Sequence, residues 1–423
     1  MPDENNFQHA AYSRSDPGKR ADYRAYAPDA PNGSPAWQAA MSDLGGRLAD
    51  AGVRVILFLH GTYLGADVFG MQRLDEVGGL KRGYSRGIPG VDALLALMRE
   101  GSNGLPTRRG GERPPFPDDD GVKKEVDEQA EDGANFSAPY VDLFEKAINR
   151  GAGRPILCLR FLWSCEQHHL GRAREAVNFI DRLRTVCDEG KLGPDDRMLV
   201  QAHGQAGLVI ALVSNLLAPG NSGGRERFFD ALRSSVASPH PEKLSRVEQL
   251  IRGGNPLNGV ALDVVTFGTP VRYGWDPAGL EKLLHIVNHR PMRIDGKRWL
   301  AKMELPQITM EMPIAWGGDY VQQLAVAGTD AVPPSPEAKT ANKALWELLE
   351  PFDGFERWLE CARKSVRCQN DGHCLLVDYK DAGSNTPKDH VYGHAAYTRM
   401  SAMLFNTTEI VRSIYLPVTG GSF

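Results

Sequence analysis

A strand-like segment runs directly into an apolar, helix-like segment around Gly204. Residues 200–207 read Val-Gln-Ala-His-Gly-Gln-Ala-Gly, with alanine or glycine on both sides of the turn. Small neighbours are what a sharply folded strand-to-helix turn needs, and such a turn presents the serine of a Gly-x-Ser-x-Gly pattern to its substrate. His203 and Gln205 fill the variable positions, and Gly204 stands where the serine would be. The pattern predicts a nucleophile turn without its nucleophile.

This segment resembles the nucleophile turn of lipases and esterases in the α/β-hydrolase superfamily. Those enzymes carry His-Ser-Gln-Ala/Gly-Gly where residues 203–207 read His-Gly-Gln-Ala-Gly. The resemblance spans roughly residues 50–415, apart from an insertion. It implies a serine hydrolase that forms an acyl-enzyme and needs no metal or cofactor. Because glycine has no side chain, the chain itself is predicted to be inactive or nearly so.

The resemblance also implies a triad acid after the nucleophile turn. Residues 327–334 read Ala-Gly-Thr-Asp-Ala-Val-Pro-Pro, which is similar to the acid loop of the family, so Asp330 is the predicted acid. Asp378 and Asp381 compete for the role, since they lie at or just after the end of a predicted strand.

The triad histidine should follow the acid in the chain. His394 directly follows a glycine and precedes a helix-like segment, which fits the family best, and His390 is the alternative. In the implied mechanism the histidine takes the serine proton, while the carboxylate holds the tautomer of the imidazole and stabilises the imidazolium.

Amide donors for an oxyanion are implied at the end of an early apolar strand. His60-Gly61-Thr62 ends that strand, and in similar enzymes a His-Gly here contributes to the oxyanion hole. Backbone N–H groups must face the oxygen that gains charge in the tetrahedral intermediate. The implied donors are the amides of Thr62 or Tyr63 and of Gln205.

Other residues are predicted to line the substrate site. Thr269 belongs to a Phe-Gly-Thr-Pro segment that follows a strand, as lipases often show, and His60, Gly61 and His203 are also placed there. Trp163, His168 and His169 follow another strand. One possibility is that all three line the pocket. The other is that Trp163 belongs to the core and the two histidines lie on the surface.

The elements that position these residues alternate along the chain. Short apolar runs predict strands at about 53–62, 155–161, 197–202, 260–267, 320–327 and 374–379. Helices are predicted at about 37–51, 140–150, 170–187, 207–217, 277–287 and 395–414. Alternating strands and helices predict an α/β fold, with a mostly parallel central sheet flanked by helices in one core domain.

Two regions depart from this alternation. Residues 1–35 are polar, with scattered Pro, Gly and Ser, and are predicted to form an irregular arm ahead of the hydrolase domain at 36–423. The insertion at about 66–138 holds a helix-like piece at 91–99 and then Gly-, Pro- and charge-rich sequence. It is predicted to be either a mobile surface insertion or a lid over the site.

Composition excludes several classes of protein. The 423 residues are 42% hydrophobic and 24% charged, with a formal net charge of -4 and no basic stripe for nucleic acid. No apolar run is long enough to span a membrane. The acidic, polar start lacks a signal peptide, which predicts a cytoplasmic protein or export by a route that reads no such signal.

The six cysteines suggest no redox chemistry. Cys158 falls in an apolar strand pattern and is predicted to be a buried thiol. Cys368, His373 and Cys374 are close in sequence, but their spacing fits no zinc pattern, so a short disulfide or free thiols are favoured over a metal site.

The leading hypothesis is a carboxylic-ester hydrolase, lipase-like or esterase-like, whose nucleophile is absent. Gly204 is then either an engineered change or the natural residue of a non-catalytic relative. The alternatives are a binding protein that holds an acyl or apolar ligand in the hydrolase pocket, and a lipase-type antibacterial effector. The substrate, a small-molecule or lipid ester, is not specified further by the sequence.

Overall fold

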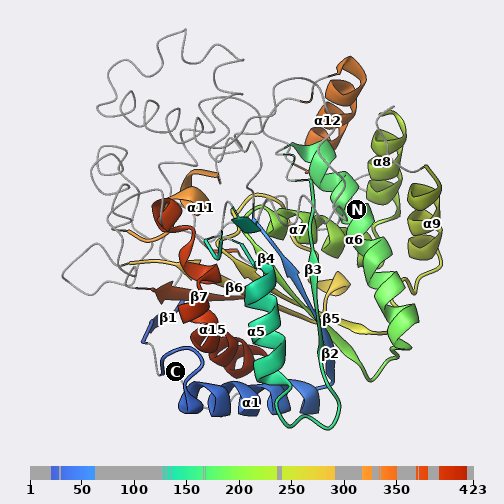
Figure 1. Ribbon diagram of the computed structural model, residues 1–423. Helices are drawn as coiled ribbons and strands as arrows, with labels where there is room; N and C mark the ends of the chain where they lie inside the picture. The colour runs from blue at the N-terminus through green and yellow to red at the C-terminus, as the bar shows by residue number, and fades with distance from the viewer. Residues whose placement is uncertain are drawn as a thin grey trace, which may run out of the picture.

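The computed structural model describes most of the core of the chain (Figure 1). The described residues are 21–27, 30–61, 127–128, 131–133, 135–164, 166, 168–235, 241–290, 317–325, 333, 335–349, 368–369, 371–379 and 390–416. The predicted helix-like piece at 91–99 and nearly all of the predicted insertion lie outside them. Among these residues no helix has both the length and the hydropathy to cross a membrane.

A seven-stranded sheet lies at the centre of the molecule (Figure 1). The strands are β1 Asp22–Ala25, β2 Val53–Leu59, β3 Leu157–Phe161, β4 Arg197–His203, β5 Ala261–Phe267, β6 Lys282–Asn288 and β7 His373–Asp378. Their order across the sheet is β1-β7-β6-β5-β4-β2-β3, and every pair of neighbours is parallel. The predicted parallel α/β architecture is therefore confirmed.

The central strands are apolar runs because helices cover both of their faces. In β4 every residue after Arg197 is buried, and β5 is buried after its first residue. A parallel strand covered on both sides cannot alternate apolar and polar side chains, so it reads as a continuous apolar run. This explains why β4 and β5 could be predicted from their apolar runs alone.

Two groups of helices cover the sheet. One core cluster packs α1 Pro35–Asp50, α5 Ala138–Ile148 and α15 Met403–Ile410 against one face. The other packs α6 His169–Gly190, α7 Ala206–Leu217, α8 Ser222–Arg233, α9 Pro241–Arg252 and α12 Pro336–Leu349 against the opposite face (Figure 1). The remaining elements are the short helix α11 Tyr320–Ala325, 3-10 turns at Pro277–Gly279, Val391–Gly393, Ala396–Thr398 and Met400–Ala402, and a π turn at Val411–Tyr415.

Local sequence sets where the helices of the first face begin. Ser34 caps α1 by accepting a hydrogen bond from the Trp37 N–H at 3.2 Å, and Ser137 caps α5 in the same way through Tyr140 at 3.3 Å. Each helix also has a proline in its first turn, where the missing N–H costs no hydrogen bond.

Three predicted elements were wrong. The segment predicted as a helix at 277–287 forms one 3-10 turn and then strand β6, because a short apolar run fits a buried strand as well as a helix. The strand predicted at 320–327 begins instead with helix α11. The long helix predicted at 395–414 is interrupted, since only Met403–Ile410 is α-helical.

The arm predicted as irregular contains a strand. Residues 22–25 form β1, which pairs with β7 at the edge of the sheet. These residues are largely exposed and include only short or polar side chains apart from Tyr23, so no apolar pattern marks them as a strand. Backbone pairing to an existing sheet edge decided their conformation.

The described cysteines are thiols. Cys158 and Cys187 are buried, and Cys158 thus matches its prediction. Cys368 and Cys374 are also buried, with their Sγ atoms 2.7 Å apart. His373 lies on the surface, where it pairs with Asp22 at 3.1 Å.

A buried ion pair joins β4 to β5 at the end of the sheet opposite Gly204. Asp263 is fully buried, and both of its oxygens accept hydrogen bonds from Arg197 at 2.8 Å. The Tyr415 hydroxyl adds a third bond at 2.7 Å, and burial, together with the carboxylate beside it, raises the pKa of that phenol. The pair links two central strands to the last turn of the described chain.

Asp263→Ala is expected to lower the free energy of unfolding by about 3 kcal/mol, because it leaves the Arg197 guanidinium and the Tyr415 hydroxyl without their shared partner. Urea denaturation followed by circular dichroism measures this. Asp230→Ala is the matched control, since Asp230 is an exposed partner of Arg233, and its change should stay within about 0.5 kcal/mol. Equal effects of the two substitutions would contradict the prediction.

Candidate functional site

The direction of winding of the sheet reverses between the carboxyl ends of β2 and β4, which is the expected position of a crevice. In the sheet, β2 lies between β3 and β4, so the chain adds β3 on one side of β2 and then β4 on the other. In open parallel sheets, ligands bind where the direction of winding reverses in this way. Gly61 follows β2 and Gly204 follows β4, and a side chain on Gly204 would begin 3.8 Å from the Gly61 Cα. The predicted oxyanion and nucleophile segments therefore meet at this crevice.

The turn at Gly204 has the predicted geometry. β4 ends at His203, Gly204 has a φ of +54°, and α7 begins at Ala206. A left-handed φ is one that glycine adopts without strain. The Gly204 N–H donates to the Phe267 carbonyl at 2.8 Å, and the Thr269 hydroxyl donates to the Gly204 carbonyl at 2.9 Å. Thr269 thus supports the turn, and its predicted contact with substrate stays a prediction.

His394 faces Gly204 across the crevice. An ideal Cβ on Gly204 would lie 2.7 Å from His394 Nε2 and 3.3 Å from its Cε1. The other ring nitrogen, Nδ1, lies 2.7 Å from Asp319 Oδ2. Asp319 is fully buried, and His394 is only 7% exposed. A carboxylate, an imidazole and Gly204, the predicted nucleophile position, are therefore in contact in that order.

Besides the contact with His394, two hydrogen bonds hold the Asp319 carboxylate. The Tyr397 hydroxyl donates to Oδ2 at 2.7 Å, and the Gln322 N–H donates to Oδ1 at 2.8 Å at the start of α11. The Tyr397 hydroxyl in turn accepts a bond from the Asn288 N–H at 2.8 Å, at the end of β6. These bonds supply partners to a carboxylate that is cut off from water. Burial raises the pKa of Tyr397 well above its usual value, which keeps this phenol a donor.

The carboxylate that contacts His394 was missed by sequence reasoning. Asp330 and Asp381 lie outside the described residues, and Asp378 pairs with Arg290 at 3.3 Å. The cause is the misassigned segment at 277–287. Had 282–288 been assigned as a strand, the segment after it would have been searched for the acid. That segment holds Asp295 as well as Asp319, so the sequence alone would not have chosen between them.

The segment before His394 is strained. Val391 and Tyr392 have φ values of +46° and +53°, which are unfavourable for side chains, and for the β-branched Val391 above all. The alternative histidine, His390, is buried and accepts a hydrogen bond from the Gly393 N–H at 3.2 Å. His390 therefore supports the turn, whereas His394 is the histidine that faces Gly204. Strain of this kind is commonly found at functional sites.

Two further histidines at the crevice are buried and neutral. His203 Nε2 donates to the His394 carbonyl at 2.9 Å, and the two rings are tilted by 48° with centroids 4.2 Å apart. Burial, with the nearby His394, lowers the pKa of His203 well below its usual value. Burial beside Arg160 lowers the pKa of His60 to about 3. Both residues therefore shape the crevice as uncharged groups.

Trp163, His168 and His169 are all buried. Trp163 donates its indole N–H to the His60 carbonyl at 2.9 Å, so it supports the wall of the crevice. His168 caps α6 by accepting the Gly171 N–H at 2.8 Å, and His169 contacts the Tyr273 hydroxyl at 2.7 Å. The alternative that placed the two histidines on the surface was wrong.

The predicted oxyanion donors are described only in part. Thr62 and Tyr63 lie outside the described residues. Gln205 forms the N-terminal end of α7, where the first N–H groups of a helix have no partner inside the helix. Its side chain turns away from Gly204 to accept two hydrogen bonds from Arg172.

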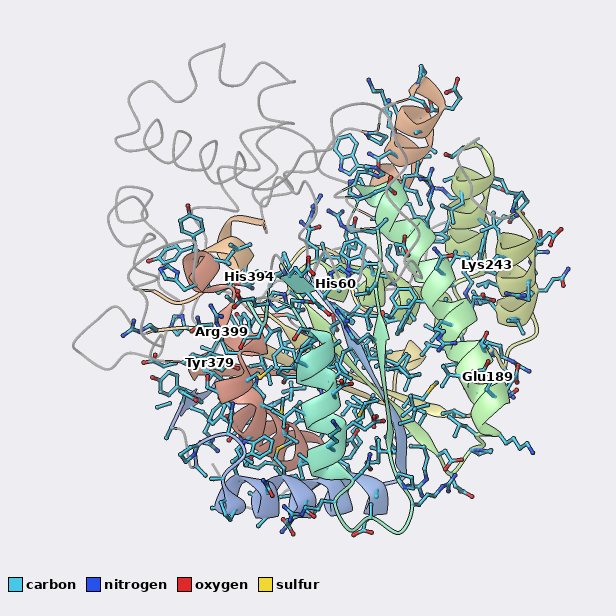
Figure 2. All side chains as sticks on the ribbon, viewed as in Figure 1. His60, Glu189, Lys243, Tyr379, His394 and Arg399 are labelled. Atoms are coloured by element: carbon cyan, nitrogen blue, oxygen red, sulfur yellow. The ribbon has the colours of Figure 1, made fainter. Side chains whose placement is uncertain are left out.

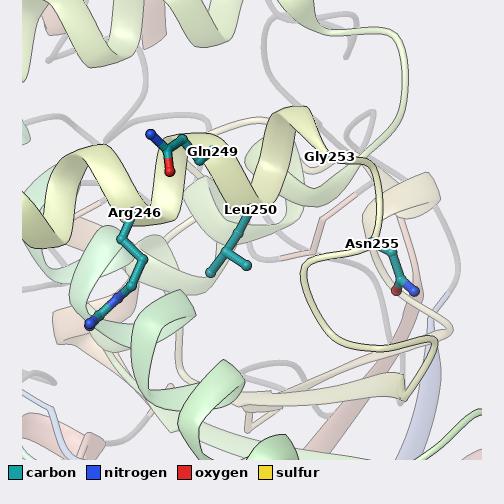
Figure 3. A pocket seen from close by; sticks show the side chains of 5 residues that line it. All are labelled: Arg246, Gln249, Leu250, Gly253 and Asn255. Carbon is teal, nitrogen blue, oxygen red and sulfur yellow. The ribbon is translucent and has the colours of Figure 1, made fainter.

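A separate open pocket lies on the outer helix layer. It has a volume of about 280 Å³ and is lined by Arg246, Gln249, Leu250, Gly253 and Asn255 of α9 and the loop that follows (Figure 3). Figure 2 shows α9, marked by Lys243, on the far side of the molecule from His394. The pocket is therefore unrelated to the crevice at Gly204.

The buried neutral histidines make stability depend on pH. The unfolded histidines take up protons below about pH 6.5, whereas folded His60 does so only near pH 3. Stability is therefore full above pH 6.5 and is lost as the pH falls below it. His60→Gln is expected to shrink the difference in unfolding free energy between pH 7.5 and 5.0 by on the order of 2 kcal/mol.

Urea denaturation at the two pH values measures this difference. His373→Gln is the control, because it removes an imidazole that is 46% exposed instead of a buried one. If His60→Gln leaves the pH dependence as it is in the unmodified chain, His60 is protonated in the folded state and its assignment as a neutral group is wrong.

Comparisons of the chain with protein-family models, with curated proteins and with solved structures found no match. The functional argument therefore rests on the geometry of the crevice itself.

Proposed function

We propose that this chain is a carboxylic-ester hydrolase scaffold of the serine type, with the α/β-hydrolase fold and Gly204 at its nucleophile position. The proposal depends above all on His394 Nε2, which lies 2.7 Å from the point where a side chain at position 204 would begin. Asp319, His394 and position 204 are in contact in the order of an acid–histidine–nucleophile triad. Along the chain they follow the order nucleophile, acid, histidine, which is typical of this fold.

The surroundings of Gly204 support acyl transfer. Gln205, at the start of α7, directly follows the nucleophile position. In hydrolases of this fold the backbone N–H of that residue supplies one oxyanion donor. The segment after β2, with Gly61 close to Gly204, is where the second donor would come from. Thr62 and Tyr63 remain the proposed residues for that donor.

The mechanism of a serine form follows from these contacts. A hydroxyl on position 204 would attack the ester carbonyl and give its proton to His394 Nε2. Asp319, which accepts a hydrogen bond from His394 Nδ1, would stabilise the imidazolium that forms. The protonated imidazole would then protonate the leaving alcohol, and water would release the acid from the acyl-enzyme.

The alternative function is ligand binding without catalysis. The close approach of the His394 imidazole to Gly204 favours this alternative, since the ring occupies space that a side chain would need. The Gly204 chain lacks a nucleophile in either case, so it is proposed to be inactive or nearly so.

Gly204→Ser is expected to raise kcat/KM for p-nitrophenyl butyrate by about a thousandfold or more over the unmodified chain, because it supplies the missing nucleophile. The imidazole tip of His394 must withdraw slightly to admit the new Cβ. Gly204→Ala is the matched control, since it adds the same Cβ without a hydroxyl and should stay at the background rate. A serine form that is folded and no faster than the alanine form would overturn the hydrolase proposal.

Substitutions in the Gly204→Ser form also show which carboxylate serves as the triad acid. In the Gly204→Ser background, Asp319→Asn and His394→Asn should each return the rate to within about tenfold of background. Asp330→Asn should leave the rate nearly unchanged. Loss of activity with Asp330→Asn alone would instead restore the acid that the sequence predicted.

A further inference from the structure

Two buried thiols are in contact beside strand β7. Cys374 is the second residue of β7, and Cys368 precedes that strand by a few residues. Their Sγ atoms lie 2.7 Å apart, and the two residues are only 9% and 1% exposed, respectively. The sequence left a short disulfide and separate thiols as alternatives for this pair. Because the sulfurs are already in contact, oxidation can join them without a large movement of the backbone.

The sheet fixes the position of Cys374. Strand β7 lies between β1 and β6, and Cys374 is opposite His285 of β6. Side chains alternate along a strand, so Cys374 shares a face of β7 with Leu376. On this face the thiol packs in an apolar cluster with Leu376 and Val287. Because strands on both sides hold the backbone of β7, the Cys374 sulfur stays directed into this cluster.

Separate contacts hold Cys368 in the same cluster. The side chain of its neighbour Gln369 donates a hydrogen bond to the Pro270 carbonyl at 3.2 Å. Just before β7, Gly372 has a φ of +75°, and a Cβ at that position would lie 2.6 Å from Leu283 Cγ. The chain thus packs closely against β6 before it enters β7. The fold therefore brings the two sulfurs together and keeps them there.

Two other described cysteines lack this arrangement. Cys158 belongs to the core cluster on one face of the sheet, and Cys187 belongs to the cluster on the other face. Burial raises the pKa of the Cys158 thiol, and it raises the pKa of Cys187 to about 11. The thiolate is the form that attacks a disulfide, so both thiols are expected to be inert near neutral pH. They serve as internal controls.

We propose that Cys368 and Cys374 are a site of reversible oxidation, which a low-molecular-weight disulfide converts to an intramolecular disulfide. The proposal depends on the direct contact of two sulfurs that different parts of the fold hold in place. Closing the bond ties the segment at 368–369, with its contact to Pro270, to the sheet. The site includes none of the residues proposed to act in ester cleavage, so the inference is independent of the proposed function.

The exchange balances with the small disulfide as the only oxidant. Cys374, the more exposed of the two residues, loses its proton to water, and its thiolate attacks one sulfur of oxidised glutathione. The S–S bond of glutathione breaks, and one glutathione leaves as a thiolate and takes up a proton. Cys368 then loses its proton and attacks Cys374 Sγ, and the second glutathione leaves in the same way. Two protein thiols are oxidised to one disulfide, and one glutathione disulfide is reduced to two thiols.

Peptide mapping of the unmodified, folded chain tests the proposal. The chain is equilibrated in mixtures of oxidised and reduced glutathione and then denatured, and its remaining thiols are blocked with N-ethylmaleimide. Trypsin cuts after Arg367 and Lys380, so both cysteines fall in one peptide, 368–380. We expect this peptide to be about 2 Da lighter than its reduced form and to carry no maleimide. The peptides that contain Cys158 and Cys187 should carry maleimide.

Three results of the mapping would overturn the proposal. They are maleimide on both cysteines of peptide 368–380, glutathione that remains on either of them, and a disulfide from either of them to a different cysteine. Glutathione should not remain, because the second thiol is already in contact with the sulfur that it attacks and displaces it.

The same mapping in urea tests whether the fold holds the pair ready. In the folded chain, half of peptide 368–380 should be oxidised at a ratio of oxidised glutathione to the square of reduced glutathione at least about tenfold lower than in the unfolded chain. Equal ratios in the two states would mean that the fold does not favour the disulfide, and would contradict the proposal.

Variants test the order of attack. In Cys368→Ala the second thiol is missing, so glutathione should stay on Cys374, and no internal disulfide should form. Cys158→Ala is the matched control, since it also removes a buried thiol and should leave the oxidation of peptide 368–380 unchanged. A Cys368→Ala chain that takes up no glutathione would contradict the first attack by Cys374. If this variant fails to fold, the mapping of the unmodified chain still decides the proposal.

Discussion

The uniform direction of the strands is the constraint on which the rest of the structure depends. Because every neighbouring pair in the sheet is parallel, the loops that leave the carboxyl ends of β2, β4, β5, β6 and β7 all emerge at one edge. Residues as far apart in sequence as Gly61, Gly204, Asp319 and His394 are thereby brought into one crevice. No local propensity could bring them together, since each belongs to a different loop.

The buried Asp319 carboxylate is the polar centre of this edge. Burying a carboxylate is costly unless its oxygens are well supplied with donors, and here His394, Tyr397 and the Gln322 amide provide them. The same bonds set the tautomer of His394, since Nδ1 must carry the proton that faces Asp319. The orientation of Nε2 toward Gly204 is a consequence of how the carboxylate is satisfied.

Glycine at position 204 changes what this arrangement can do. In a catalytic triad the imidazole activates a nucleophile, whereas here the imidazole of His394 and the N-terminus of α7 lie at a backbone turn that carries no side chain. The partial positive charge of a helix N-terminus stabilises negative charge, which suits an oxyanion. The same scaffold therefore supports the proposal of ester cleavage in a serine form and of little or no activity in the glycine form.

The sequence by itself determined the parallel α/β architecture and the strand-to-helix turn at Gly204, and it favoured His394, the histidine that faces this turn, because apolar runs, small residues and a Gly-His pair are local patterns. It did not determine Asp319, β1 or the contact of Arg172 with Gln205. A short apolar run such as 282–288 suits a strand or a helix equally, and an exposed segment such as 22–25 becomes a strand only when a sheet edge accepts it. The partner of a buried charge is chosen by packing between distant segments, as with Asp319 and His394 or Arg172 and Gln205, so only the tertiary structure decided it.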